Sequence, residues 1–254
     1  MYFIKKINKK NKKIISFSLW GNSLKYLVGA KKNILLAKKI YPEWICRIHI
    51  DDDFLNQNQE LINFITSKNN TEVVVFPNAS DSIGYFWRFY PCSDIDVDIM
   101  ISRDCDSRLS IREKKSVEKW LKSKYLFHIM RDHPNHNFII LAGMWGARCS
   151  KTLRNMSELI ENFKIENRFT IDQEFLEKQV YPLVKETTYL SDPFIEKIPF
   201  PGIRWGYNFV GNVYDEFDSP NIEYIKQLNL YIKERRFELY RSWVLNILKS
   251  YLKK

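Results

Sequence analysis

The sequence predicts an α/β fold, with a mostly parallel, doubly wound (Rossmann-like) sheet and helices on both of its faces. Short apolar runs typical of buried strands alternate with segments of helical spacing from about residue 14 to residue 180. Hydrophobic residues make up 45% of the 254 residues, which is enough for a large core. No internal repeat or Gly/Ser-rich linker divides residues 1–218, so we expect them to form one domain, followed by a helical extension over residues 219–254.

The first half of the chain supplies three predicted strands and the helices between them. A strand is predicted over 14–20, and the turn at 21–23 caps a helix that ends near Ile40, before Pro42. Alternation of residue type over 44–50 predicts a second strand, which ends in a solvated acidic turn at 51–53. A helix at about 59–66 leads into a third strand at 73–76, and an aromatic helix is expected over 82–90.

The second half begins with an apolar strand that runs from Val97 to about Ser102. Ser110 and Glu113 have capping-box spacing and open a helix to about residue 123. Strands are predicted over 125–130 and 138–142, and helices near 152–163 and 172–180. Pro220 suits the first turn of a C-terminal helix, which no later Pro or Gly interrupts.

The C-terminal helix is predicted to be amphipathic and basic. Its apolar residues fall on one stripe at 3- and 4-residue spacing, and lysines and arginines lie elsewhere on it. Two interpretations follow: the stripe packs back on the domain, which is the more common arrangement, or the helix docks peripherally on an anionic membrane. No run of 18 apolar residues exists, so the sequence predicts no membrane-spanning segment.

Cysteine usage and the N-terminus favour a cytoplasmic location. The four cysteines are widely spread, with no CxxC or zinc spacing, so reduced thiols are expected. The basic N-terminus is not followed by an apolar segment, which argues against a signal peptide. We therefore expect a cytoplasmic protein. If its C-terminal helix docks on an anionic membrane, the protein is also peripheral at the membrane surface.

The formal net charge of +10 indicates attraction to anions. Phosphates, nucleotide sugars, nucleic acid and acidic membrane surfaces all qualify, and charge alone does not select one. The positive charge is concentrated at the two termini and no nucleic-acid-binding motif is present, so no nucleic-acid partner is expected. A non-catalytic basic protein that binds nucleic acid remains the alternative from another functional class.

Asp104 and Asp106 follow directly after the apolar strand at 97–102. Open α/β sheets bind ligands at the carboxyl ends of their strands, and carboxylate oxygens are hard ligands for Mg²⁺ or Mn²⁺. Two carboxylates at this spacing suit a cation that neutralises a diphosphate. Asp also favours turns for its own hydrogen bonding, which is the structural alternative. The working hypothesis is a metal-dependent enzyme that acts on a nucleotide-activated substrate.

Two loops at predicted strand ends add polar candidates. Trp20, at the end of the first strand, is positioned to stack on a base. In the loop after 125–130, Arg131 and His133 suit phosphate binding, and Asp132 suits a sugar hydroxyl. His133 also suits acid–base or ligand chemistry. The histidines of this loop do not complete a tetrahedral zinc site.

Two segments further along the chain complete the set of candidates. Gly143 lies among small residues at a predicted strand end, where the backbone can approach a ligand closely. Asp172 and Gln173 open a predicted helix. An ordinary turn and a helix cap are the structural alternatives for these two segments.

Taken together, the order of these motifs resembles metal-dependent glycosyltransferases of the GT-A fold. The matching segments are Arg103-Asp104-Cys105-Asp106-Ser107-Arg108, residues 127–134, Gly143-Met144-Trp145-Gly146 and Asp172-Gln173-Glu174-Phe175-Leu176. They look like those of bacterial-type glycan-building transferases. The Asp-x-Asp and Asp-Gln pieces are also similar to the retaining family that includes glycogenin and bacterial lipooligosaccharide galactosyltransferases. The resemblance covers about residues 15–215 and makes 1–218 a single GT-A-like catalytic domain.

The resemblance implies a hexosyltransferase that moves a sugar from a nucleotide sugar, in the first place a UDP-sugar, to a glycan or lipid-linked acceptor, as in polysaccharide biosynthesis. By position, Asp104 and Asp106 resemble the carboxylates that hold Mn²⁺ or Mg²⁺ against the donor diphosphate. Asp172 and Gln173 resemble the pair that faces the donor sugar, and Gly143 resembles the position where the backbone meets that sugar.

The resemblance also implies contacts from Arg88 and Arg103 to phosphate or sugar, and it contains one departure. The retaining family supplies a late histidine as a third metal ligand, whereas residues 209–212 contain none and no histidine follows His136. Metal binding then uses another group, or depends on the aspartates, phosphates and water.

The sequence leaves the stereochemistry and the reaction class open. If Gln173 lies under the sugar face, the reaction retains the anomeric configuration. If Asp132 or Asp172 lies by the acceptor hydroxyl, that carboxylate is the base of an inverting reaction. A metal-dependent phosphohydrolase or nucleotidyltransferase that uses the same aspartates is the alternative among enzymes.

Overall fold

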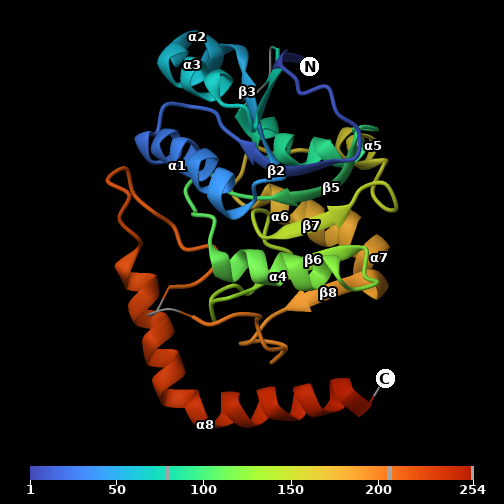
Figure 1. Cartoon of the computed structure of the whole chain (residues 1–254), viewed down its shortest axis with the longest axis vertical. Helices are drawn as coiled ribbons and strands as arrows, with labels where there is room; N and C mark the ends of the chain where they lie inside the picture. The colour runs from blue at the N-terminus through green and yellow to red at the C-terminus, as the bar shows by residue number, and fades with distance from the viewer. Residues whose placement is uncertain (78–80, 205–207, 253–254) are drawn as a thin grey trace.

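The computed structural model describes residues 1–77, 81–204 and 208–252, and its centre is an eight-stranded mixed sheet (Figure 1). The strands are β1 (Tyr2–Lys5), β2 (Lys12–Ser18), β3 (Ile45–Asp51), β4 (Thr71–Phe76), β5 (Val97–Ser102), β6 (Phe127–Met130), β7 (Trp145–Arg148) and β8 (Thr188–Ser191). Their order across the sheet is β1–β4–β3–β2–β5–β7–β6–β8. Four neighbouring pairs are parallel and three are antiparallel, which confirms the predicted α/β class.

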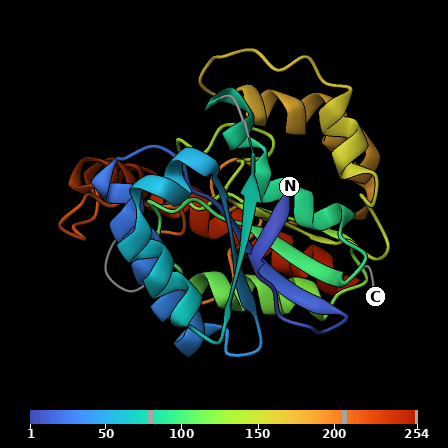
Figure 2. The same cartoon turned by 90° about the horizontal axis from the view of Figure 1, so that it is seen from above.

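Helices cover both faces of the sheet, as predicted (Figure 2). The α-helices are α1 (Leu24–Ile40), α2 (Asp52–Gln57), α3 (Gln59–Ser67), α4 (Ile111–Leu121), α5 (Met156–Glu161), α6 (Ile171–Phe175), α7 (Tyr181–Val184) and α8 (Ile222–Leu252). The 3₁₀ helices are η1 (Asp81–Tyr85), η2 (Trp87–Ser93) and η4 (Lys185–Thr187), and η3 (Leu176–Val180) is a π-helical turn. Helices α1, α3 and α4 pack on one face, and η2 and α5–α7 pack on the other.

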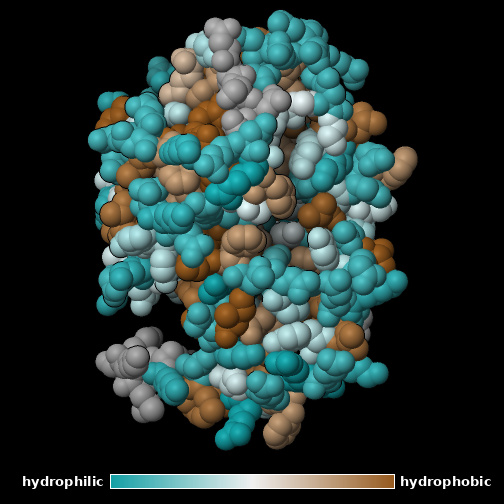
Figure 3. Space-filling view, turned by 180° about the vertical axis from the view of Figure 1, so that it is seen from behind, coloured by the Kyte–Doolittle hydropathy of each residue, from teal (hydrophilic) through white to brown (hydrophobic). Residues whose placement is uncertain are grey.

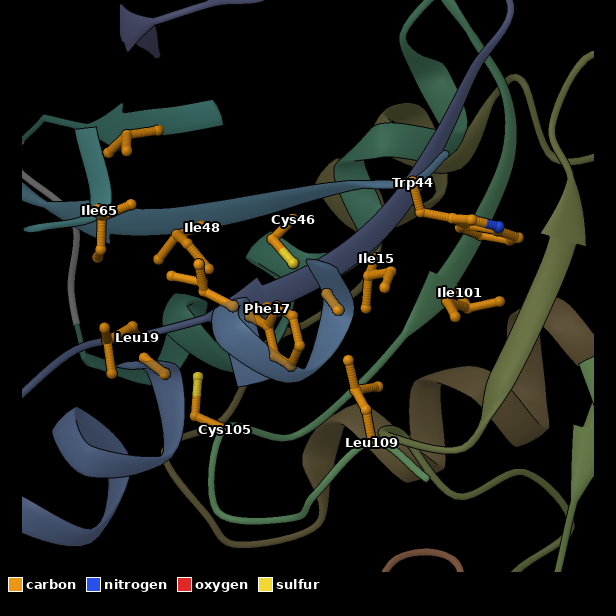
Figure 4. Close-up of a cluster of buried hydrophobic side chains, with 14 of the residues drawn as sticks. Ile15, Phe17, Leu19, Trp44, Cys46, Ile48, Ile65, Ile101, Cys105 and Leu109 are labelled. Atoms are coloured by element: carbon orange, nitrogen blue, oxygen red, sulfur yellow. The ribbon is translucent and has the colours of Figure 1, made fainter. Parts of the chain in front are cut away.

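Alternate residues of each strand divide the core into these two layers because successive side chains point to opposite faces. Ile15 and Phe17 of β2 contribute to the layer under α1, where they lie beside Cys46 and Ile48 of β3 (Figure 4). Ile14 contributes to the opposite layer. Both faces are therefore buried, which explains why the central strands are apolar at nearly every position.

The strand order reverses beside β2. From β2 the chain passes through α1 to β3 and then to β4 on one side, whereas β5 pairs in parallel with the other side of β2. The segments that follow β2 and β5 consequently meet at the carboxyl end of the sheet, where Lys25 pairs with Asp106 at 3.0 Å. This is the position at which open α/β sheets form a ligand crevice.

Several predicted elements differ in the structure. The strand predicted over 138–142 is wrong: this segment forms turns, and the strand of this region is β7, which pairs antiparallel with β5 and β6. Ser102 Oγ donates to the carbonyl of Ala142, 2.7 Å away, so this backbone bends toward the end of β5. The aromatic segment at 82–90 forms η1 and η2, with Pro91 inside η2, in place of an α-helix.

Two of the strands were not predicted from the sequence, whereas the C-terminal helix was predicted. β1 lies in the lysine-rich N-terminus and pairs antiparallel with β4, and the short β8 pairs in parallel with β6. Helix α8 confirms the predicted C-terminal helix, with non-helical backbone angles at Arg235 (Figure 1). Within the described ranges, no helix combines the length and hydrophobicity needed to cross a bilayer.

A buried ion network ties the central strands together. Lys12 of β2 and Arg47 of β3 both pair with Glu72 of β4, at 2.7 Å each, and Arg47 also pairs with Asp94 at 2.8 Å. The side chains of Lys12 and Glu72 are fully buried. Each ion therefore depends on its partners, because no water replaces them.

We predict that Glu72→Gln lowers the free energy of unfolding by about 3–5 kcal/mol, because two buried cations lose their shared counter-charge. Urea denaturation followed by circular dichroism measures the change. Glu43→Gln is the matched control, since Glu43 pairs with the neighbouring Lys13 in an exposed position. Equal unfolding midpoints for the two variants would contradict the assigned role of the network.

Candidate active site

A cavity of about 530 Å³ lies at the point where the strand order reverses. Its walls come from the loops after β2 and β5, from η1 and η2, and from segments 141–144, 169–173 and 211–213. Seven of the residues singled out in the sequence line it: Trp20, Arg88, Asp104, Asp106, Gly143, Asp172 and Gln173. Segments that are far apart in the chain, from Ser18 to Val213, thus meet in one place.

Arg88 is the central group of this cavity. Its buried guanidinium forms ion pairs with Asp104 at the end of β5 and with Asp172 at the start of α6, the latter at 2.7 Å. The backbone N–H of Arg88 donates to Ser18 Oγ at the end of β2, 2.9 Å away, which attaches η2 to the sheet. The Asp104 side chain remains 41% exposed, so it presents an oxygen to the cavity.

Asp106 lies deeper than Asp104 and pairs with Lys25 of α1 at 3.0 Å. Burial raises the pKa of Asp106, and the negative charge of Asp104 raises it further. The side chain of Lys25 is 34% exposed and long enough to move away from the carboxylate. The pair of aspartates therefore forms a negative site that favours binding of a further cation.

Gly143 allows the backbone to pass directly against the Asp104 carboxylate. A β-carbon at this position would lie 2.0 Å from Asp104 Oδ2, so any side chain here would displace the Asp104 carboxylate. Because Gly143 has no side chain, the Asp104 carboxylate can lie directly against the backbone that follows Ala142. This close approach explains why a glycine stands here.

The opposite end of the cavity is aromatic. Trp20 packs edge-on against Tyr85 and Trp87, at ring-centre distances of 5.1 and 6.0 Å, and Gly84 accommodates its ring. Trp20 and Tyr85 both line the cavity. Such rings offer a flat apolar surface to a planar ligand group.

Asp172 and Gln173 form the wall at the start of α6. Burial raises the pKa of Asp172, while the Arg88 guanidinium lowers it, and the net shift is upward. The Oε1 atom of Gln173 is buried and has no hydrogen-bond partner among the described residues. Thr170, which precedes the helix in a left-handed conformation (φ 70°), also lines the cavity. An unpaired amide oxygen beside a cavity is a ready contact for a ligand.

Two arginines expected at the site lie elsewhere. Arg103 is buried beside α4, where its Nε atom donates to Glu113 at 2.8 Å and Nη1 donates to the Trp145 carbonyl at 3.1 Å. Arg131 pairs with Asp192 at 2.8 Å. Neither arginine lines the cavity and each pairs with a carboxylate outside it, so the prediction that they contact phosphate is corrected.

Asp132 and His133 also lie outside the cavity walls. Asp132 is fully buried and accepts hydrogen bonds from Arg112, from Arg204 and from the backbone N–H of Val210. His133 Nε2 lies 2.9 Å from the Tyr224 carbonyl, on the first turn of α8. The acid–base and ligand roles predicted for both side chains are replaced by structural ones.

Other residues line the cavity without having been predicted: Tyr26, His136, Met144, Gly211 and Val213. The position of Tyr26, in the first turn of the helix after β2, offered a usable signal, because helix N-termini of doubly wound sheets face the crevice. Gly211 and Val213 carried no such signal. They reach the site through tertiary folding of a segment without regular structure.

The donor set fits a divalent cation of the Mg²⁺ or Mn²⁺ type. Among residues 1–77, 81–204 and 208–252, no group of three or more His, Cys, Asp and Glu side chains suits a metal ion. Asp104 and Asp106 provide two carboxylates in the cavity. Mg²⁺ in proteins is commonly bound by one or two carboxylates together with substrate phosphates and water, and this pair meets that requirement.

We predict that Gly143→Ala destabilises the protein by roughly 1–3 kcal/mol, because the new methyl group displaces the Asp104 carboxylate. In an Asp104→Ala background the same change should cost much less, since the clashing group is gone. A double-mutant cycle by urea unfolding measures the difference. An equal cost of Gly143→Ala in both backgrounds would show that the contact is not the cause.

No protein-family model and no curated protein matches the chain. A glycosyltransferase involved in the glycosylation of the major capsid of PBCV-1 aligns over 71% of this chain and 81% of its own, with 14% identity and a TM-score of 0.47. The 4-diphosphocytidyl-2C-methyl-D-erythritol synthase of Anaerococcus prevotii aligns over 72% and 87%, with 10% identity and a TM-score of 0.48.

The glycosyltransferase GlyE of Streptococcus pneumoniae aligns over 72% of this chain, with 15% identity and a TM-score of 0.44. This chain spans 45% of the length of GlyE. At such identities and TM-scores, these likenesses carry no functional argument.

Proposed function

We propose that this chain is a glycosyltransferase that moves a sugar from a nucleotide sugar, in the first place a UDP-sugar, to a glycan or lipid-linked acceptor. The observation that carries the proposal is the convergence of Asp104, Asp106, Gly143, Asp172 and Gln173 in one cavity at the carboxyl end of the sheet. These are the motifs that resemble GT-A glycosyltransferases in the sequence, and they lie far apart along the chain.

Asp104 and Asp106 are the residues that would hold Mn²⁺ or Mg²⁺. Bound there, the cation supplies Lewis acidity to the oxygens of the departing diphosphate. The exposed oxygen of Asp104 and the raised pKa of Asp106 support this assignment. Lys25 would leave Asp106 on binding and become free to pair with phosphate.

Arg88 and Trp20 would bind and orient the donor. Arg88 keeps Asp104 and Asp172 in fixed positions on either side of the cavity. Trp20 and Tyr85 supply a surface on which a nucleobase can stack. A donor bound across these groups would place its sugar near Gly143 and α6.

The geometry favours retention over inversion. Asp132 is excluded as a base because it is buried and shared by two arginines. Asp172 is engaged by Arg88. The amide oxygen of Gln173, which has no hydrogen-bond partner in the described part of the chain, is suited to stabilise positive charge on the anomeric carbon.

We predict that Asp104→Asn or Asp106→Asn lowers the rate of UDP release from a UDP-sugar with Mn²⁺ at least a hundredfold, because the cation site loses a charged ligand. Asp98→Asn is the control, since Asp98 lies on the same strand and bonds Ser150 outside the cavity. A thermal-shift screen of nucleoside diphosphates and nucleotide sugars, with and without Mn²⁺, selects the donor.

Product analysis separates the remaining reaction classes. Full activity in both variants would remove the metal role assigned to the pair. Free sugar without any acceptor-linked product would indicate a phosphohydrolase-type reaction. Steeply salt-dependent binding to oligonucleotides, with no binding of nucleotide sugars, would favour the non-catalytic alternative.

We further propose that α8 brings the enzyme to an anionic membrane surface. The helix bends at Arg235, and its second half is attached to the body by one face. Trp243 Nε1 donates to the Pro193 carbonyl at 3.0 Å, and Asn246 donates to the Lys197 carbonyl at 2.7 Å. Leu239 is buried on this same face.

The outer face of this half-helix is apolar and exposed. Phe237, Tyr240, Val244 and Leu248 follow one another at 3- and 4-residue spacing and are 38–84% exposed. Hydrophobic and hydrophilic side chains alternate closely on the lower part of the molecule, where α8 lies (Figure 3). Residues 233–249 contain five lysines and arginines and two glutamates. Apolar residues beside excess positive charge are complementary to anionic lipid headgroups.

We predict that the protein co-sediments with phosphatidylglycerol-containing vesicles and much less with pure phosphatidylcholine, because binding needs both burial and charge. The double variant Phe237→Ser/Leu248→Ser should lose most of this binding, and added salt should weaken it. Leu230→Ser is the control, since Leu230 is an exposed leucine on the first half of α8. Unchanged sedimentation of the double variant, or self-association through this face, would contradict the membrane role.

A further inference from the structure

The loop that follows β6 contains two histidines in the same tautomeric arrangement. His133 Nδ1 accepts the backbone N–H of Asn135, 3.1 Å away. His133 Nε2 therefore carries the proton and donates to the Tyr224 carbonyl at 2.9 Å. Protein groups thus satisfy both ring nitrogens of His133.

Within the described ranges, His136 has a partner for the first of these bonds and none for the second. Its Nδ1 accepts the backbone N–H of Asp132 at 3.1 Å. Because Asp132 is fully buried, no water can replace this acceptor, and the bond determines the orientation of the ring. A neutral imidazole that accepts at Nδ1 carries its proton at Nε2.

The surroundings of His136 keep it neutral and in place. Burial, followed by the neighbouring His133, lowers the pKa of His136 to about 3. Its ring lies against Phe209, with ring centres 5.7 Å apart. A β-carbon on Gly211 would lie 3.3 Å from His136 Cε1, so the glycine leaves room beside the ring. Among the described residues none accepts a hydrogen bond from Nε2, and His136 lines the cavity.

We propose that His136 is a ligand-binding residue whose Nε2–H group donates to a diphosphate oxygen of the donor. This inference rests on the proposed function. Arg88 and Lys25 already form ion pairs with Asp104, Asp172 and Asp106. A neutral donor adds a contact for phosphate without adding charge, and phosphate oxygens are the strongest acceptors such a ligand offers.

The tautomer also excludes His136 as a metal ligand through Nε2. Ligation at that atom would require the proton to move to Nδ1, where it would face the N–H of Asp132. Two donors would then lie 3.1 Å apart, and a buried backbone N–H would lose its acceptor. The Nε2–H group of His136 is therefore a hydrogen-bond donor and not a metal ligand.

The test compares binding of UDP in the presence of Mn²⁺ by titration calorimetry. His136→Asn keeps an oxygen that can accept the N–H of Asp132 but no longer reaches the ligand, and we expect roughly tenfold weaker binding. His136→Gln places a donor further out and should recover part of the affinity. His133→Asn is the matched control and should change the unfolding midpoint while leaving the dissociation constant unchanged.

The outcomes separate this inference from the function on which it rests. If the wild type does not bind UDP with Mn²⁺, both the proposed function and the role of His136 are contradicted. If the wild type binds and His136→Asn binds equally well, only the role of His136 falls. Nitrogen-15 NMR of the ring provides a readout without ligand: we expect the Nε2–H tautomer, unchanged between pH 5 and 8, and an Nδ1–H tautomer would overturn the inference.

Discussion

The candidate active site depends on one buried guanidinium. Arg88 pairs with Asp104 at the end of β5 and with Asp172 at the start of α6, and its backbone is bonded to Ser18 at the end of β2. Without that positive charge, the carboxylates of the cavity would repel one another in a poorly solvated space. The arginine therefore allows acidic groups from distant segments to share a cavity and still leaves an oxygen of Asp104 accessible.

A second charged cluster, around Asp132, lies outside the cavity walls and connects the loop after β6 with other elements. Asp132 receives hydrogen bonds from Arg112, Arg204 and the backbone of Val210, so it connects α4 with the segment before α8. The same loop then provides His133, which bonds to α8, and His136, which faces the cavity. One short loop thus links the proposed membrane-binding helix to the proposed donor site through two adjacent histidines.

The features of the site complement one another chemically. In the proposed function the aspartate pair binds a cation and the aromatic wall stacks on a base, while Gln173 offers an amide oxygen that has no partner among the described residues. Gly143 and Gly211 leave the space that a β-carbon would fill, beside Asp104 and His136 respectively. In the proposed reaction the protein mainly positions the donor and stabilises the leaving diphosphate, which is where electrostatic preorganisation contributes most.

The sequence by itself determined the α/β class, most strands, the C-terminal helix and the candidates in the Asp-x-Asp and Asp-Gln motifs. Local periodicity and strand-end position carry that information, since both depend on neighbouring residues. Only the tertiary structure decided which polar side chains face the cavity. Arg103 and Arg131 pair with Glu113 and Asp192, whereas His136 Nε2 has no acceptor among the residues that the structure describes. A buried charged side chain is stable only beside a counter-charge, and in this protein the counter-charge comes from a residue that is remote in the sequence. The sequence near the strand end therefore does not show which partner it has.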